Sequence, residues 1–301
     1  MTTNERRFRL VDTLYLALAI IPMVLAMALK VLTAPPTEGL SISGALIYFT
    51  IPLPLQDFPV TESQVNSLAV LLCIFWMCRY LTHGLEDRPG MKRHVLAEWV
   101  VEQTDNLIKG NMGEYFKAFS PFIGAILALS ALSSLSSLLG LYPPTSDLNI
   151  VAGWAILVFG LITYYKMKCG PVHYAKSFSE PIALMTPMNV ISEIATPISM
   201  AFRHYGNVLS GSVISALIAN ALGGLSNTLL GWIPLIGEIP LLRIGLPAIL
   251  SVYFDLFSGG LQAFIFATLT MLYIAGGFPA DDYAKRKLEK EAKKKNKAKA
   301  A

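Results

Sequence analysis

One arginine in the middle of a long apolar run carries the most demanding chemistry in this sequence. Arg203 lies between Pro181 and Pro234, and Glu193 is the only other formally charged residue of that run. A guanidinium at bilayer depth costs about 2.5 to 3.5 kcal/mol and stays charged at physiological pH. Arg203 is about 30 Å of helix from either end of the run, too far for its side chain to snorkel. We predict that it faces a protein interior or a water-filled path.

Further polar residues recur at helical spacing around this arginine and in the last apolar segment. Asn207 follows Arg203 by four residues, so the two share a helix face. Asp255, Gly259 and Gln262 are spaced four and three apart and are predicted to share another. Asp255 could form a plain buried ion pair with Arg203, and Gln262 could form an interhelical hydrogen bond. A functional polar seam between the two helices is the alternative that we develop.

Long apolar helices must hold these side chains. The chain is 54% hydrophobic and 15% charged, with a mean hydropathy of +0.54. Continuous apolar runs of about 20 residues predict spanning helices, and only helices or closed barrels satisfy the backbone in lipid. We therefore expect an all-α polytopic membrane bundle with about six membrane helices. The runs that indicate them are Thr13–Leu29, Ser63–Cys78, Ala118–Ser146, Leu148–Tyr165, Pro181–Pro234 and about Pro247–Ala275.

The last two helices are expected to be long and strongly tilted, because their apolar runs exceed the bilayer thickness. Gly223, Gly224 and Pro234 are predicted to form the external turn between them. A further segment, Val95–Lys109, mixes apolar and charged residues and is predicted to be an amphipathic helix on the membrane surface.

Charge along the chain predicts its orientation. Basic residues follow the second and fourth spans, and the tail 281–301 carries nine Lys or Arg against four Asp or Glu. The positive-inside rule then places both termini in the cytoplasm. The tail is expected to be disordered and to touch anionic lipid, so nucleic acid is not an expected partner. The three cysteines have no metal-ligand spacing, and neither a metal nor a cofactor is expected.

The first apolar run has two interpretations. Arg6, Arg7 and Arg9 precede it, and Ala26-Met27-Ala28 resembles a cleavage site, a pattern typical of a signal peptide. The other interpretation is a retained first helix with a cytoplasmic N-terminus, which agrees with the orientation of the remaining spans.

At its polar residues the chain closely resembles subunit a of the F-type ATP synthase, the stator component of a rotary membrane motor. The resemblance covers roughly residues 64–276 and leaves out the first sixty residues and the basic tail. It depends on three motifs: Arg203-x-x-Gly206-Asn207 with Pro197 before it, Leu261–Phe266, and Asp147-Leu148-Asn149.

The resemblance implies an ion channel of the membrane sector in the bacterial inner membrane, not an enzyme by itself. Two half-channels would deliver ions, most simply protons, to a rotating c-ring whose membrane carboxylate faces Arg203. Asn207 and Gln262 would position the arginine, and Glu193 and Ser199 would line the cytoplasmic half-channel. The implied partners are the c-ring, the b subunits of the peripheral stalk, membrane lipid and, indirectly, the F1 sector. Sodium remains open as the ion.

The chain departs from the family pattern at two informative positions. Some members carry a glutamate where this chain has Ser212, and the same members carry a histidine where it has Asp255. We infer that the titratable group of the outer half-channel has moved to Asp255, with Asp147 at the channel mouth. His204 is expected to be a packed, hydrogen-bonded side chain rather than a proton relay.

Three regions follow: an N-terminal helix and external loop (1–63), the membrane domain (64–280) and the tail (281–301). The rival function is an ion-coupled secondary transporter in which Arg203 binds an anionic substrate. No inverted repeat is visible between the two halves, which disfavours a transporter built by duplication.

Overall fold

The computed structural model describes residues 3–33, 44–54, 56–85, 91–179, 182–230, 245, 249–250, 252–279 and 283. Six of the described helices are long and apolar enough to cross a membrane, which confirms the predicted all-α polytopic fold. The described helices and strands are α1 (Thr3–Thr33), β1 (Ile47–Ile51), β2 (Phe58–Thr61), α2 (Glu62–Thr82), α3 (Lys92–Asn111), η1 (Glu114–Phe119), α4 (Ser120–Leu135), η2 (Ser136–Leu139), η3 (Pro144–Ser146), α5 (Leu148–Lys166), η4 (Met167–Cys169), α6 (Pro171–Ser177), η5 (Ala183–Met185), α7 (Thr186–Leu230), η6 (Tyr253–Ser258) and α9 (Gly259–Gly277).

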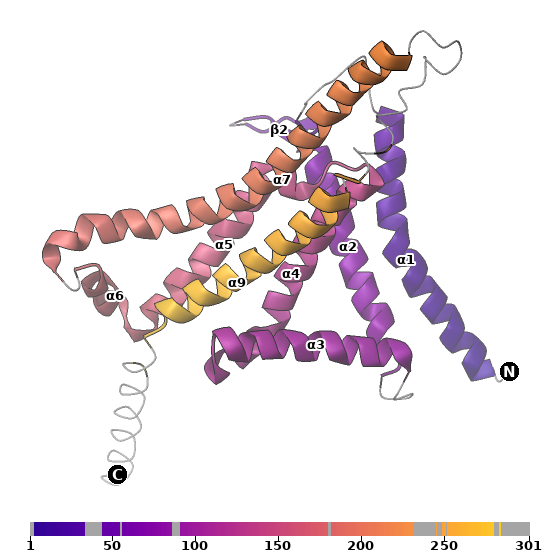
Figure 1. The fold of residues 1–301 in the computed structure, drawn as a ribbon. Coiled ribbons are helices and arrows are strands. Elements are labelled where there is room, and N and C mark those ends of the chain that lie inside the picture. The colour runs from indigo at the N-terminus through magenta and orange to yellow at the C-terminus, as the bar shows by residue number, and fades with distance from the viewer. Residues whose placement is uncertain are drawn as a thin grey trace.

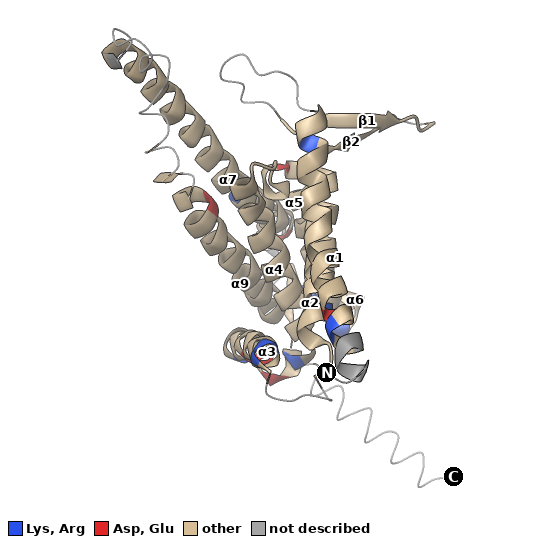
Figure 2. Cartoon of the chain, turned by 90° about the vertical axis from the view of Figure 1, so that its right-hand side faces the viewer, with Lys and Arg blue, Asp and Glu red and all other residues tan. Residues whose placement is uncertain are grey.

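The spanning helices form a bundle with two distinct ends (Figure 1). The hairpin β1–β2 lies at one end, beside the start of α2, where Glu62 N donates to Leu46 O, Lys30 of α1 pairs with Glu62, and Ser63 donates to Asp147; we call it the hairpin end. Helix α3 runs across the other, the α3 end. Most of the helical surface between the two ends carries no charged side chain (Figure 2). Many large hydrophobic side chains of these helices are also exposed, and a lipid environment requires an exterior of this kind.

Helices α4, α5 and α9 enclose the apolar core of the bundle. Ile123, Val158 and Phe266 are fully buried there. Helix α9 packs on α4 with a very close backbone approach: a Cβ atom placed on Gly259 would lie 2.7 Å from Ser134 Cβ. Small residues at such crossings let membrane helices pack tightly. The serine-rich stretch of α4 therefore serves packing, and it also brings hydroxyl groups into the interior.

Helix α1 is joined to the bundle by charged contacts near both of its ends. Near the α3 end, Asp12 pairs with Arg93 at 2.7 Å and with His83 at 2.8 Å. At the hairpin end, Lys30 Nζ lies 2.9 Å from Glu62 Oε1, and Glu62 is buried. Removing either partner of a buried pair leaves an uncompensated charge. These contacts favour the retained-helix interpretation of the first apolar run.

One sequence prediction about α7 is wrong. Gly223 and Gly224 do not form a turn, because both lie inside α7, which continues to Leu230. A helix in lipid must satisfy every backbone group internally, so glycine alone does not end it there. Pro234 and Pro247, as well as nearly all of the basic tail, lie outside the described residues.

Candidate functional site

Arg203 projects from the surface of α7 instead of into the bundle. Its neighbours Met200, Ala201 and His204 are buried against other helices, whereas Phe202 and Arg203 are exposed. Among the described residues, Arg203 belongs to none of the ion pairs or hydrogen bonds. The plain ion pair with Asp255 is therefore not found. A permanent cation on the apolar exterior of a membrane helix requires water or a partner of opposite charge, and none of the described residues supplies that partner.

His204, the next residue, has the opposite environment. Its side chain is fully buried, and its ring packs edge-on against Trp154 and Phe266, with centroids 6.0 and 5.3 Å apart. Nε2 lies 3.3 Å from Ser130 Oγ, within hydrogen-bonding distance. The ring therefore locks α7 against α4, α5 and α9, and this contact fixes the direction in which Arg203 points.

One turn after Arg203, α7 meets the last membrane helix through a polar contact. Asn207 Nδ2 lies 3.0 Å from Ser258 Oγ, and Ser258 Oγ lies 3.2 Å from Asn207 Oδ1. One turn further, Gly211 packs against Phe254, whose side chain lies 3.1 Å from an added Cβ. A small pocket between the two helices is lined by Ser134, Asn207, Val208, Gly211, Phe254, Asp255, Ser258 and Gly259. Of the residues predicted to form the seam, Asn207 and Asp255 line this pocket, whereas Arg203 and Gln262 do not.

Asp255 does not share a regular helical face with Gln262. It lies in a π-helical segment, Tyr253–Ser258, in which the wider turn changes the direction of successive side chains. Asp255 is half-buried beside the pocket, whereas Gln262 is buried about two turns further along, in α9. The predicted spacing of Asp255, Gly259 and Gln262 assumed a regular α-helix, and the π-helical turn invalidates that assumption. Such turns are frequent at functional sites.

From this pocket, hydroxyl groups continue toward the hairpin end. Ser134 Oγ lies 3.4 Å from Thr145 Oγ1, and both residues are buried. Two residues later, Asp147 caps α5 by accepting a hydrogen bond from Asn149 N at 3.0 Å. Its other carboxylate oxygen accepts a hydrogen bond from Ser63 on α2. The short segment η3, which contains Thr145, thus joins the pocket to the Asp147 carboxylate.

Three buried polar atoms around η3 have no hydrogen-bond partner among the described residues: Asn66 Oδ1, Ser133 Oγ and Ser146 Oγ. They belong to α2, α4 and η3, which contact one another. Leaving a buried polar group unsatisfied costs about 1 to 3 kcal/mol. Atoms of this kind are suited to bind water or a passing ion, so the region has the chemistry of a hydrated path.

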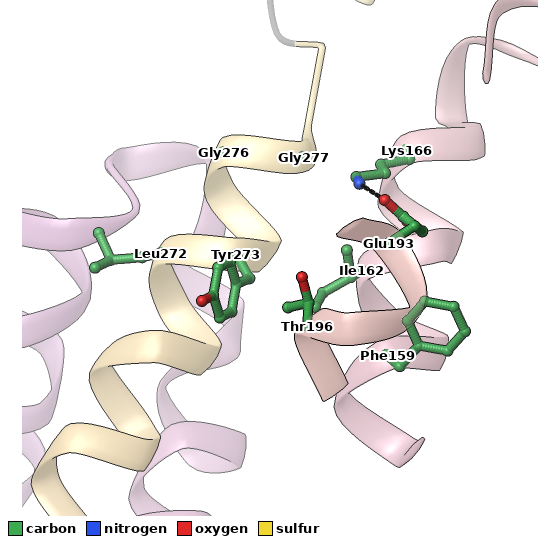
Figure 3. A pocket seen from close by; sticks show the side chains of 9 residues that line it. All are labelled: Phe159, Ile162, Lys166, Glu193, Thr196, Leu272, Tyr273, Gly276 and Gly277. Atoms are coloured by element: carbon green, nitrogen blue, oxygen red, sulfur yellow. Dashed lines mark hydrogen bonds and ion pairs between the residues drawn. The ribbon is translucent and has the colours of Figure 1, made fainter. Parts of the chain in front are cut away.

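At the α3 end, Glu193 lies in a second pocket between α5, α7 and α9 (Figure 3). Glu193 Oε2 pairs with Lys166 Nζ at 2.5 Å, and the hydroxyl of Tyr174 donates to Glu193 Oε1 at 3.3 Å. Burial, and then the Glu193 charge, raise the pKa of Tyr174, so its hydroxyl keeps the proton that it donates. The pocket has a cavity volume of about 180 Å³ and opens to the surface; Thr196 and Tyr273 also line it.

The structure separates the remaining predicted residues from these pockets. Ser199 is exposed on α7, and Ser212 is exposed with its hydroxyl bonded to Leu209 O at 2.8 Å. Sequence reasoning missed Ser258 and Lys166. Ser258 lies three residues after Asp255 and four before Gln262, a spacing that could have revealed it. Lys166 had no local signal, because its partner lies 27 residues away.

Comparison with known proteins adds independent findings. A family model described as ATP synthase A chain matches residues 64–275. ATP synthase subunit a of Bacillus subtilis is 32% identical, over 76% of this chain and 96% of its own length. The protein from Bacillus velezensis is 31% identical with the same coverage. A protein of Propionigenium modestum named ATP synthase subunit a, sodium ion specific, is 28% identical over 80% of this chain and 88% of its own length.

Proposed function

This chain belongs to the ATP synthase A chain family, and from that membership we propose that it carries protons through two half-channels to a c-ring at Arg203. The family role is that of an ion-channel subunit in the membrane sector, which works with the c-ring and other subunits and is not catalytic by itself. The bacterial relatives and the six apolar helices make it a multi-pass bacterial membrane protein. Membership of this family disfavours the alternative function, an ion-coupled secondary transporter.

The exposure of Arg203 is the observation that carries the proposal. Its guanidinium projects from an apolar helix, where its charge is costly unless an anion or water faces it. A carboxylate on a rotating partner would supply that anion once per passing ring subunit. Because arginine keeps its proton, it attracts the deprotonated carboxylate without exchanging protons with it. The same cation repels other cations and so prevents direct leakage between the half-channels.

The outer half-channel runs from the hairpin end to the Asp255 pocket. It begins at Asp147, passes Thr145 and Ser134, and reaches Asp255 beside the Asn207–Ser258 contact. The unsatisfied hydroxyl and amide oxygens around η3 support a hydrated route there. Asp255 replaces the family glutamate at the position of Ser212 as the titratable group. Adjacent hydroxyl and carboxylate groups of this kind can pass a proton along.

The inner half-channel is the open pocket around Glu193 at the α3 end. Lys166 and Tyr174 hold the carboxylate at the pocket mouth, and Thr196 lies one helical turn closer to Arg203. Ser199 continues this direction along α7 toward Arg203. We assign the α3 end to the cytoplasm, because the basic residues after the spans cluster there. The b subunits, membrane lipid and, indirectly, the F1 sector complete the proposed partners.

ATP-driven ion uptake by the purified complex in sealed vesicles tests this function. We expect the chain to copurify with a c-ring and soluble catalytic subunits. Uptake should persist without sodium, collapse with a protonophore and resist a sodium ionophore. Sodium-dependent uptake that resists the protonophore would identify sodium as the ion, the specificity named for the Propionigenium modestum relative. A chain that purifies alone and transports a solute without ATP would contradict the rotary function.

A further inference from the structure

The hairpin β1–β2 has an exposed apolar face. The strands are antiparallel, with Phe49 opposite Val60 and Ile51 opposite Phe58. Opposed residues of a pair, and residues two apart on one strand, point to the same side of a sheet. These four side chains therefore share one face. Phe49, Ile51 and Phe58 are 57%, 43% and 46% exposed, and Leu53 just beyond the strand is 52% exposed.

A hairpin of this composition is not suited to stand alone in water. Two strands without a packed apolar partner are at best marginally stable there. Contiguous apolar patches on a protein surface usually mark a site that meets another protein or a membrane. The strands are paired with this face exposed, and none of the described residues covers it, so apolar surroundings beyond them are expected to do so.

The position of the hairpin indicates lipid as that cover. Thr61 is the last residue of β2, and Glu62 immediately begins the spanning helix α2, so no linker separates the hairpin from the membrane span. On the neighbouring helix α1, Val31 and Leu32 are 75% and 83% exposed in the last turn. The lipid-facing surface of α1 therefore extends to the level at which the hairpin starts.

The orientation of the strands agrees with this position. Figures 1 and 2 both show the hairpin projecting sideways from the bundle instead of continuing along the helix axes. A hairpin that projects sideways from a membrane bundle at this level lies in the plane of the interface. The strand edges can then face headgroups and water while one face contacts acyl chains. This arrangement avoids unsatisfied backbone groups in the hydrocarbon region.

We propose that the face formed by Phe49, Ile51, Phe58 and Val60 inserts into the outer leaflet and anchors the start of α2 in the membrane plane. The anchor matters for the site because the first turn of α2 supplies Ser63, which donates to Asp147. Asn66, one turn later, donates to Tyr142 O at 2.9 Å. The hairpin therefore acts as a membrane-plane support for the helix end that holds the α4–α5 connection.

Lipid contact can be measured with the whole complex in phosphatidylcholine vesicles. In a background with Cys73, Cys78 and Cys169 replaced by alanine, one variant carries Phe49→Cys and a second carries Phe58→Cys, each labelled with an environment-sensitive fluorophore. Thr50→Cys is the matched control, because Thr50 lies on the opposite face, paired with Pro59. Doxyl-labelled phosphatidylcholine reports lipid contact, and aqueous iodide reports water contact. Copurification of the other subunits shows that each variant assembles.

We expect labels at positions 49 and 58 to be quenched several-fold more strongly by the doxyl lipid than the label at position 50, with the opposite order for iodide. Strong iodide quenching at 49 and 58 without lipid quenching would place the face in water and overturn the proposal. Protection from both quenchers would mean that a protein partner covers the face, which also overturns it. Because this measurement does not depend on pumping, it can fail while the proposed function holds.

Discussion

Arg203→Ala is expected to reduce ATP-driven ion pumping to background while the complex remains assembled. The exposed guanidinium makes none of the ion pairs or hydrogen bonds among the described residues, so its removal should not unfold the bundle. Removing one partner of a desolvated charge pair typically costs about 2 to 5 kcal/mol, and 2 kcal/mol alone corresponds to about a thirtyfold loss of rate. Quenching of a pH-sensitive dye in vesicles measures the loss.

Arg9→Ala is a suitable control for this variant. Arg9 is also an exposed cation on a membrane helix, but it lies near the N-terminal end of α1, outside the apolar centre. Its removal should leave pumping close to the wild-type rate. Normal coupled pumping by Arg203→Ala would show that the cation has no part in translocation, and the assignment of the site would then be wrong.

Asp255→Asn is expected to slow translocation strongly. The substitution keeps the size of the side chain and its ability to form hydrogen bonds, but it removes the titratable group beside the Asn207–Ser258 contact. A positioned acid or base typically contributes about 10² to 10⁴ to a proton-transfer rate, so a loss of about a hundredfold is expected. The initial rate of ATP-driven uptake measures it, and Asp57→Asn, at an exposed acid beyond the spans, serves as the control.

A second substitution tests whether the acid has moved between helices. Ser212 is exposed on α7, next to Gly211, which lines the Asp255 pocket. A glutamate placed at position 212 in the Asp255→Asn background should restore part of the uptake rate. Wild-type uptake by Asp255→Asn alone would show that Asp255 is not in the ion path.

The membrane architecture could be predicted from the sequence because lipid imposes a simple rule. A helical segment that spans a membrane must be long and apolar, so each of the six described spanning helices corresponds to a continuous apolar run in the sequence. Arg203 could be singled out for the same reason, because a charge in such a run is costly wherever the helix packs. Its exposure in the structure, with no ion pair or hydrogen bond to the described residues, is compatible with the partner on another protein that the family resemblance implies.

The parts that could not be predicted depend on residues far apart in the chain or on small changes of helix geometry. Lys166 forms an ion pair with Glu193 only because α5 and α7 pack together, and Ser63 donates a hydrogen bond to Asp147 only because α2 contacts η3. The π-helical turn at Asp255 contains no unusual residue type, so the spacing of polar and apolar residues could not predict it. Gly223 and Gly224 resembled a turn because glycine ends many helices in water, where exposed carbonyl groups can bind solvent.

Photochemical crosslinking from position 202 tests most directly whether the partner of Arg203 lies on another protein. Phe202 is 55% exposed beside Arg203, and p-benzoylphenylalanine can replace it while the arginine remains. Illumination of the assembled complex in membranes should yield a covalent adduct with a c-ring subunit, identified by its mass. The same amino acid at Leu14, an exposed position on α1, should label lipid without that adduct. Lipid labelling alone at position 202 would contradict the account.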